Sequence, residues 1–259
     1  MSATPDVDLR GLLAFAQEIA WQAGRATLGH FQRRLAVDWK EDASPVTVAD
    51  REAEQMLRRS IGERFPEHDV FGEEYGEDER KSSHRWIVDP IDGTRSFISG
   101  VPLYATLVGL EIEGDVAVGV ANFPALGEMV AAAVGLGCWW NGRPARVSSV
   151  SRLEESLLVY TDAAELAEAR PEAWRRLQAA TRLQRGFGDA YGHCLVATGR
   201  AEIALDAIMK PWDNAALLPI VKEAGGVFSD WSGTPTIYGG NAVSAPPSLL
   251  DPVLELLEG

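Results

Sequence analysis

Two aspartates stand at the end of an apolar run in the segment WIVDPIDGTRSFISG, residues 86–100. The triplet at 86–88 is typical of a buried strand, and Asp89 and Asp92 follow it within four positions. Isolated buried charge is expensive, so such a pair requires a cation, a hydrogen-bonding partner or solvent. The segment therefore predicts a site that handles charge at the end of a strand.

Two further carboxylate stations have the same setting. Glu73 and Glu74 follow the apolar pair at 70–71, and Asp213 opens an amphipathic segment, MKPWDNAALLPIVKEAGG. Hard divalent cations such as magnesium take oxygen ligands, with few of them from any one segment. Only His84 lies near these stations, in a polar run, so the pattern favours magnesium over zinc.

Each station also has a local explanation. Asp213 alone could cap a helix, and the Asp89/Asp92 pair could form an Asx-turn. Glu73 and Glu74 could belong to a solvated acidic loop, GEEYGEDE. For each carboxylate taken alone, the local role is a reasonable alternative to metal binding. For all of them taken together with the Asp-Pro-Ile-Asp-Gly-Thr string, a shared metal site is favoured.

The composition limits the class of protein. The 259 residues are 46% hydrophobic and 24% charged, as in ordinary globular proteins, with no apolar run of the ~18 residues that a membrane span needs. The net charge of −14 argues against nucleic acid or an anionic membrane as a partner. The short acidic N-terminus does not resemble a signal peptide, and Cys138 and Cys194 suit buried thiols, so we expect a cytoplasmic protein.

The elements that must position these residues can be predicted from periodicity. We expect helices over 9–34, from Thr47 onward, over 167–180 and over 213–225, a hairpin turning at 113–115, and strands over 156–162 and 201–208. Helices and strands alternate after residue 150, which predicts a sheet layered between helices. We place a boundary near Ser149, between an α+β subdomain (1–148) that carries the DPIDGT site and an α/β subdomain (149–259) that contributes Asp213 and substrate contacts.

The order of motifs resembles a known superfamily. SPVTVAD (44–50), GEE, DPIDGT, PWD-x-AA and EAGG (223–226) follow one another as in the inositol monophosphatase superfamily, magnesium-dependent, lithium-sensitive phosphatases of small phosphomonoesters. The resemblance implies an α/β fold, a layered αβαβα sandwich of the inositol monophosphatase and fructose-1,6-bisphosphatase type, assembled as a homodimer.

The resemblance also implies roles for individual positions. The metal ligands would be Glu73, Asp89, the backbone carbonyl of Ile91, Asp92 and Asp213, holding two or three Mg²⁺, with Mn²⁺ as an alternative. Glu73, Thr94 and Asp89 would be catalytic, with Thr94 and Glu73 orienting and deprotonating the attacking water. The substrate contacts would be Asp92, Gly93, Thr94, Arg95, Arg185, Asp189, Asp206 and Asp213. Lys40, Asp42 and Asp50 match a mobile segment and a supporting carboxylate in relatives, and a plain surface role is equally open for them.

The choice of substrate depends on two stretches. DGTRSFISG and QRGFGDAYGHCLVATGR (184–200) resemble the histidinol-phosphatase branch of the superfamily. Histidinol phosphate carries a protonated amine and an imidazole, so a specific site needs carboxylates away from the metals. Asp189 and Asp206 are the candidates, although Asp189 could instead cap the helix that follows it. The alternative is an inositol-1-monophosphatase of broad specificity.

Two other classes fit less well. A non-enzymatic relative would lack a metal ligand, whereas every ligand position is filled here. A calcium-binding module of the helix–loop–helix type would show closely spaced acids with a glycine and a terminal glutamate, and that signature is absent.

Overall fold

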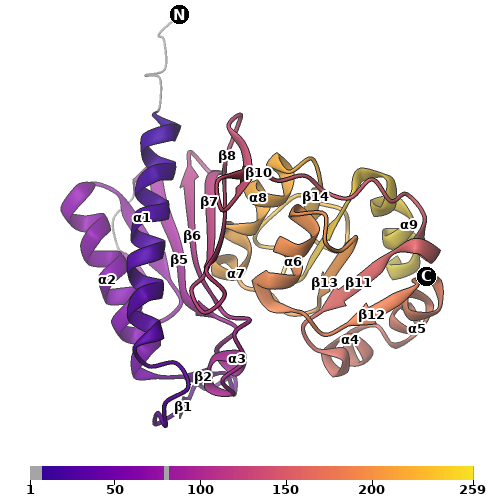
Figure 1. The fold of residues 1–259 in the computed structure, drawn as a ribbon, viewed down its shortest axis with the longest axis horizontal. Helices are drawn as coiled ribbons and strands as arrows, with labels where there is room; N and C mark the ends of the chain where they lie inside the picture. The colour runs from indigo at the N-terminus through magenta and orange to yellow at the C-terminus, as the bar shows by residue number, and fades with distance from the viewer. Residues whose placement is uncertain (1–7, 79–81, 259) are drawn as a thin grey trace, which may run out of the picture.

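The computed structural model describes residues 8–78 and 82–258, which form five layers (Figure 1). Two long helices cover one face of a large sheet, three helices lie between this sheet and a smaller one, and three more cover the outer face of the smaller sheet. In the order of the layers these are α1 (Leu9–Leu28) and α2 (Val48–Arg64), then α6 (Asp189–Ala197), α7 (Pro211–Ala215) and α8 (Leu217–Glu223), then α4 (Ala163–Ala169), α5 (Pro171–Ala180) and α9 (Pro247–Glu258). The predicted αβαβα sandwich is confirmed.

The large sheet has the order β10-β9-β8-β7-β6-β5-β3-β4. Its strands are β3 (Asp69–Gly72), β4 (Gly76–Glu77), β5 (His84–Asp92), β6 (Ala105–Ile112), β7 (Asp115–Phe123), β8 (Glu128–Ala133), β9 (Gly137–Trp140) and β10 (Arg143–Pro144). All neighbours are antiparallel except β3 and β5. The hairpin predicted at 113–115 is confirmed, since β6 ends at Ile112 and β7 begins at Asp115.

The small sheet has the order β12-β11-β13-β15-β14. Its strands are β11 (Leu157–Tyr160), β12 (Leu183–Arg185), β13 (Ile203–Asp206), β14 (Val227–Ser229) and β15 (Ala242–Ala245). β11 runs parallel to both β12 and β13, so the carboxyl ends of these strands meet at one edge. The strands predicted over 156–162 and 201–208 are therefore confirmed, although each is shorter. A two-stranded ribbon of β1 (Asp38–Trp39) and β2 (Pro45–Val46) stands apart from both sheets.

Apolar side chains fill the spaces between the layers. Trp86 and Leu57 are fully buried between the large sheet and the α1–α2 layer. Leu107 and Ile220 are buried between this sheet and α8, and Leu158 and Leu249 between the small sheet and its outer helices. Because each sheet is buried on both faces, the strand ends are rigid platforms for polar side chains.

Three predicted helices differ from the structure in their bounds. The first ends at Leu28 rather than residue 34. The helix predicted over 167–180 is interrupted at Arg170, because Pro171 removes an N–H donor and its ring keeps the preceding residue out of the helical region. The helix predicted over 213–225 is instead two short helices that meet at Ala216. The helix start at Thr47 is confirmed, with Thr47 and Asp50 forming a capping box.

The connection between the sheets runs from Pro144 to Leu157 and contains the boundary expected near Ser149, which stays a prediction. Residues 1–7, on which part of the expectation about the N-terminus depends, lie outside the described residues. Within 8–78 and 82–258, no helix is long and apolar enough to cross a bilayer.

Candidate active site and metal centre

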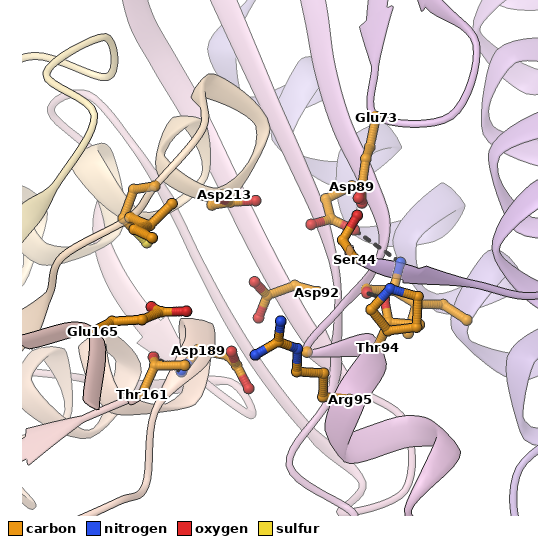
Figure 2. Close-up of a pocket in the computed structure, with 15 residues that line it drawn as sticks. Ser44, Glu73, Asp89, Asp92, Thr94, Arg95, Thr161, Glu165, Asp189 and Asp213 are labelled. Atoms are coloured by element: carbon orange, nitrogen blue, oxygen red, sulfur yellow. Dashed lines mark hydrogen bonds between the residues drawn. The ribbon is translucent and has the colours of Figure 1, made fainter. Parts of the chain in front are cut away.

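A pocket of about 200 Å³ opens where the two sheets approach each other, and most of the predicted site residues line it. Figure 2 shows their side chains converging from both halves of the chain. The lining residues are Ser44, Pro45, Glu73, Asp89, Ile91, Asp92, Gly93, Thr94, Arg95, Thr161, Glu165, Asp189, Ile208, Met209 and Asp213. The structure therefore brings together Glu73, the DPIDGT segment, Asp189 and Asp213 in one pocket.

An irregularity in β5 explains how both aspartates of DPIDGT reach the same pocket. In a regular strand, residues three apart point to opposite faces. Here Asp89 is opposite Leu107 and Asp92 opposite Ala105, so the β5 side of the pair holds one extra residue, as in a β-bulge. Pro90 lies in this bulge, where its missing N–H costs no ladder bond.

Backbone donors hold the three central carboxylates in place. The N–H of Ile91 donates to Asp89 Oδ1 at 2.9 Å, an Asx-type turn, and the N–H of Ala190 donates to Asp92 Oδ2 at 2.8 Å. Asp213 is the third residue of α7 and accepts from the N–H of Lys210 at 2.7 Å. The Asx-turn expected at Asp89 is thus confirmed, whereas the N-cap of α7 is Lys210 and Asp213 accepts from its N–H at the third helical position; both arrangements coexist with the shared site.

The three carboxylates form a donor set that fits a hard cation. One oxygen from each of Asp89, Asp92 and Asp213 lies within 4.8 Å of the others. Burial, then repulsion from neighbouring carboxylates, raises the pKa of Asp89 and of Asp92 well above the ordinary value. Burial also raises the pKa of Asp213 to about 7. Since each buried ion costs roughly several kcal/mol, three together require compensating positive charge, and oxygen ligands suit magnesium.

Glu73 lies beside this cluster but is turned toward a lysine. Lys40 Nζ lies 2.7 Å from Glu73 Oε1 and 2.7 Å from Glu74 Oε1. Burial alone would lower the pKa of Lys40, but the two carboxylates more than offset this and raise it. Lys40 is therefore an internal countercharge at the pocket, not a solvated surface residue, whereas Asp42 is exposed and bonds Ser44.

Thr94 is fixed from two sides at the start of α3 (Thr94–Ile98). Its hydroxyl lies 2.9 Å from the carbonyl oxygen of Ile91 and 3.3 Å from Asp50 Oδ1. Asp50 is buried and also accepts from the N–H and hydroxyl of Thr47. The capping box of α2 thus reaches the pocket, and Asp50 supports Thr94 instead of lying at the surface.

Gly93 allows the backbone to approach the opposite wall. Its φ of 77° lies in the left-handed region, and a Cβ there would come within 2.8 Å of Asp189 Oδ2. Any side chain at this position would therefore displace Asp189.

Asp189 forms the wall that faces the DPIDGT segment. It is the first residue of α6 and has a φ of 53°, and the N-cap of this helix is Gly188, so the helix-cap alternative is wrong. Its N–H donates to Thr161 Oγ1 at 2.6 Å. Burial, followed by repulsion from Asp206, raises the pKa of Asp189 to about 7.

Two predicted contacts lie away from the pocket lining. Asp206 is buried behind the wall, where it accepts from the Thr161 N–H at 2.9 Å and lies 3.0 Å from His193 Nε2. Arg185 is exposed at the end of β12 and donates to the carbonyl oxygen of Gln184. The structure thus gives Asp206 a supporting position and places Arg185 outside this cavity.

Sequence reasoning missed several lining residues. Ser44 and Pro45 belong to the SPVTVAD string, and Thr161 and Ile208 lie at or next to the ends of predicted strands, so these four residues had a usable signal. Glu165 had none, because it reaches the pocket only through the way α4 folds back.

Comparison with known proteins agrees with this geometry. The model of the inositol monophosphatase family matches residues 8–257. A histidinol-phosphatase of Chlorobaculum parvum is 48% identical over 244 residues, 93% of this chain and 91% of its own. A histidinol-phosphatase of Mycobacterium tuberculosis is 39% identical over 231 residues, 86% of this chain and 88% of its own. The crystal structure of the extragenic suppressor protein suhB from Bartonella henselae matches with a TM-score of 0.90 at 29% identity, over 96% of this chain and 98% of that one. The chain therefore belongs to the inositol monophosphatase family.

Proposed function

We propose that this protein is a magnesium-dependent histidinol-phosphate phosphatase, which converts L-histidinol phosphate and water into L-histidinol and phosphate in histidine biosynthesis. The observation that carries the proposal is a single pocket with two acidic ends, Asp89, Asp92 and Asp213 at one and Asp189 with Glu165 at the other. The first end suits cations that hold a phosphate, and the second suits a substrate whose organic part is positively charged. The similarity to two histidinol-phosphatases supports the same substrate.

Magnesium held by Glu73, Asp89, Asp92, Asp213 and the Ile91 carbonyl would neutralise the phosphate and stabilise charge on the leaving oxygen. The Thr94 hydroxyl directs its hydrogen toward the Ile91 carbonyl or Asp50, so its lone pairs can accept a hydrogen bond from the attacking water. Glu73 is the base that takes the proton of this water. Lys40 frees the Glu73 carboxylate for this role by keeping its other contact, with Glu74. The new bond joins the water oxygen to phosphorus as the bond from phosphorus to the histidinol oxygen breaks, and the leaving histidinol oxygen takes a proton from solvent water.

Two further substrate contacts, at Gly93 and Arg95, belong to the proposal. Gly93 leaves room for a phosphate next to the amide groups that begin α3, since no side chain shields them. Arg95 lines the pocket beside them and can approach either the phosphate or the opposite wall.

Finer features remain part of the proposal. Two or three Mg²⁺ would occupy the site, with Mn²⁺ as a substitute, and a homodimer in the cytoplasm is expected from the resemblance. Light scattering of the purified protein measures the oligomer, and titration of metal-stripped protein measures the number of ions bound.

The test is a substrate panel with metal-stripped protein. Histidinol phosphate, inositol 1-phosphate and fructose 1,6-bisphosphate are each assayed with magnesium withheld and restored. We expect activity only with magnesium and a kcat/KM highest for histidinol phosphate. A preference for inositol 1-phosphate would overturn the substrate and favour the broad-specificity alternative, and equal activity without divalent cations would overturn the metal centre.

A further inference from the structure

The end of the pocket opposite the metal centre carries an unequal number of charges. Glu165 and Asp189 line it as carboxylates, and Arg95 is the basic residue that lines the same cavity. Arg95 lowers the pKa of both carboxylates through space, so the three groups share one electrostatic environment. Figure 2 shows the Arg95 guanidinium beside Asp189, with Glu165 facing them from α4. One carboxylate would be balanced by Arg95, and the second leaves a surplus negative charge.

We propose that Glu165 is a specificity-determining residue, whose carboxylate supplies the surplus charge that selects a phosphomonoester carrying an ammonium group over a neutral polyol phosphate. Arg95 balances Asp189, and the substrate cation balances Glu165. This inference rests on the proposed phosphatase activity and names a residue that discriminates between its substrates.

The start of α4 holds Glu165 in place. Asp162 caps the helix by accepting from the N–H of Ala164 at 2.7 Å and from the N–H of Glu165 at 3.4 Å. Leu166 is buried among the apolar side chains under α4 and α5, which fixes the rotation of the helix. With Leu166 directed into the core, the neighbouring Glu165 side chain reaches the pocket and stays only partly buried.

The opposite carboxylate is equally constrained. Asp189 is held in its left-handed conformation by the bond from its N–H to Thr161 Oγ1, and the next residue is tied to Asp92. Burial, followed by repulsion from Asp162, raises the pKa of Glu165, and burial also raises that of Asp189. Arg95 lowers both pKa values but does not offset burial, so a bound ammonium group beside Glu165 would add the positive charge that this end lacks.

Asp206 is a poorer candidate for this role. One of its oxygens accepts from the Thr161 N–H, and the other faces His193, whose second nitrogen lies 2.7 Å from Ser244 Oγ. Asp206, His193 and Ser244 are all buried, so this chain of bonds positions Thr161 from behind. Asp206 therefore acts on the pocket as a positioning residue.

The test combines a change of charge on the protein with a change of charge on the substrate. We compare kcat/KM of wild type and Glu165→Gln for histidinol phosphate and for its N-acetylated form, which lacks the ammonium charge. Glu165→Gln should lower kcat/KM about tenfold for the charged substrate, mainly through KM, and leave the acetylated one almost unchanged. Glu168→Gln, an exposed change on the same helix outside the pocket, is the matched control and should alter neither.

Three results would contradict the role of Glu165. Equal losses on both substrates, or no loss on either, would overturn the role of Glu165. Glu165→Ala is the second variant, because a partly exposed side chain can be truncated without leaving a buried hole, and it should match Glu165→Gln. If wild type acts on both forms equally well, charge selection is absent and the inference fails without any variant.

A further pair of substrates distinguishes this inference from the proposed function. Phosphoethanolamine carries an ammonium group in its organic part, glycerol 1-phosphate carries only hydroxyl groups there, and neither is histidinol phosphate. A protein inactive on histidinol phosphate would contradict the proposed function, yet Glu165→Gln should still lower the ratio of phosphoethanolamine to glycerol 1-phosphate turnover. An unchanged ratio in an active phosphatase would overturn the role of Glu165 alone.

Discussion

The two ends of the pocket hold carboxylates in opposite ways. At the metal end, Asp89, Asp92 and Asp213 are tied to backbone N–H groups of a strand bulge and two helix starts, and no basic side chain lies among the lining residues there. At the distal end, Glu165 and Asp189 face Arg95 and are partly exposed. The three aspartates of the metal end have no basic partner among the lining residues, because Lys40 is bound by Glu73 and Glu74, so this end suits cations that can hold any phosphate. The distal end is more open and has one carboxylate more than Arg95 can balance, so it can distinguish substrates.

The largest expected effect lies at the metal end. Asp92→Asn removes charge with little change in volume, so it should lower turnover roughly 10³-fold on every substrate by removing electrostatic stabilisation. The far-ultraviolet circular dichroism spectrum should stay unchanged. Steady-state kinetics with saturating magnesium measures the effect, with Asp251→Asn on the exposed side of α9 as the control. A rate near that of wild type would remove Asp92 from the metal site.

A smaller loss is expected for the residue that orients the water. Thr94→Ala should lower kcat roughly 10²-fold with little change in KM, the range expected for assistance to proton transfer. Combining it with Glu73→Gln should cost little more than the poorer single variant, because the two groups act as a unit. Losses that multiply in the double variant would mean that they act independently. Asp50→Asn should weaken the same step, since it removes the charged partner of the Thr94 hydroxyl.

Replacing Asp206, which lies behind the pocket lining, should have a milder effect on turnover that is the same for all substrates. Asp206→Asn weakens the bonds to Thr161 and His193, so we expect a loss of about 1–3 kcal/mol in the free energy of unfolding. Turnover of charged and neutral substrates should fall by similar small factors. Urea denaturation and the substrate pair used for Glu165 measure both. A loss confined to histidinol phosphate would show direct contact between Asp206 and the substrate.

The smallest effect concerns pH in the metal-free protein. The pKa values of Asp213 and Asp189 are raised to about 7 in the folded state from an ordinary 3.8, so the folded protein holds extra protons between these values. Their contribution to stability is complete below about pH 4 and is lost as the pH rises through about 7. Differential scanning calorimetry should give a Tm at pH 8 lower than at pH 6 by roughly 2–4 °C. Magnesium should reduce the drop by replacing the proton of Asp213 at the metal end, and a metal-free Tm that rises with pH would contradict the assignment of these shifts.

The two ends of the pocket also differ in how far they could be predicted from the sequence. The metal end is encoded in short contiguous strings, and DPIDGT with Gly93 specifies its own bulge, turn and helix start. The interruption at Arg170 also had a signal, since Pro171 follows it, but the helical periodicity of 167–180 outweighed it. Glu165 had no such signal, because its position depends on how α4 packs through Leu166 against residues far away in the chain. Asp206 is predicted as a substrate contact but lies behind the pocket lining, where it faces the buried side chain of His193, and this contact had no signal in the sequence either.

Two adjacent residues at the start of α6 serve different ends of the pocket. The N–H of Ala190 holds Asp92, while Asp189 faces Arg95 and adopts a backbone conformation that costs most residues roughly 1–2 kcal/mol. A mutation at position 189 therefore disturbs chemistry and recognition together, and selection should retain it. Position 165 has no contact of this kind with the metal end. In the evolution of related phosphatases, new substrate preferences should arise first on α4, where a single codon change can alter selectivity without the loss of an essential activity.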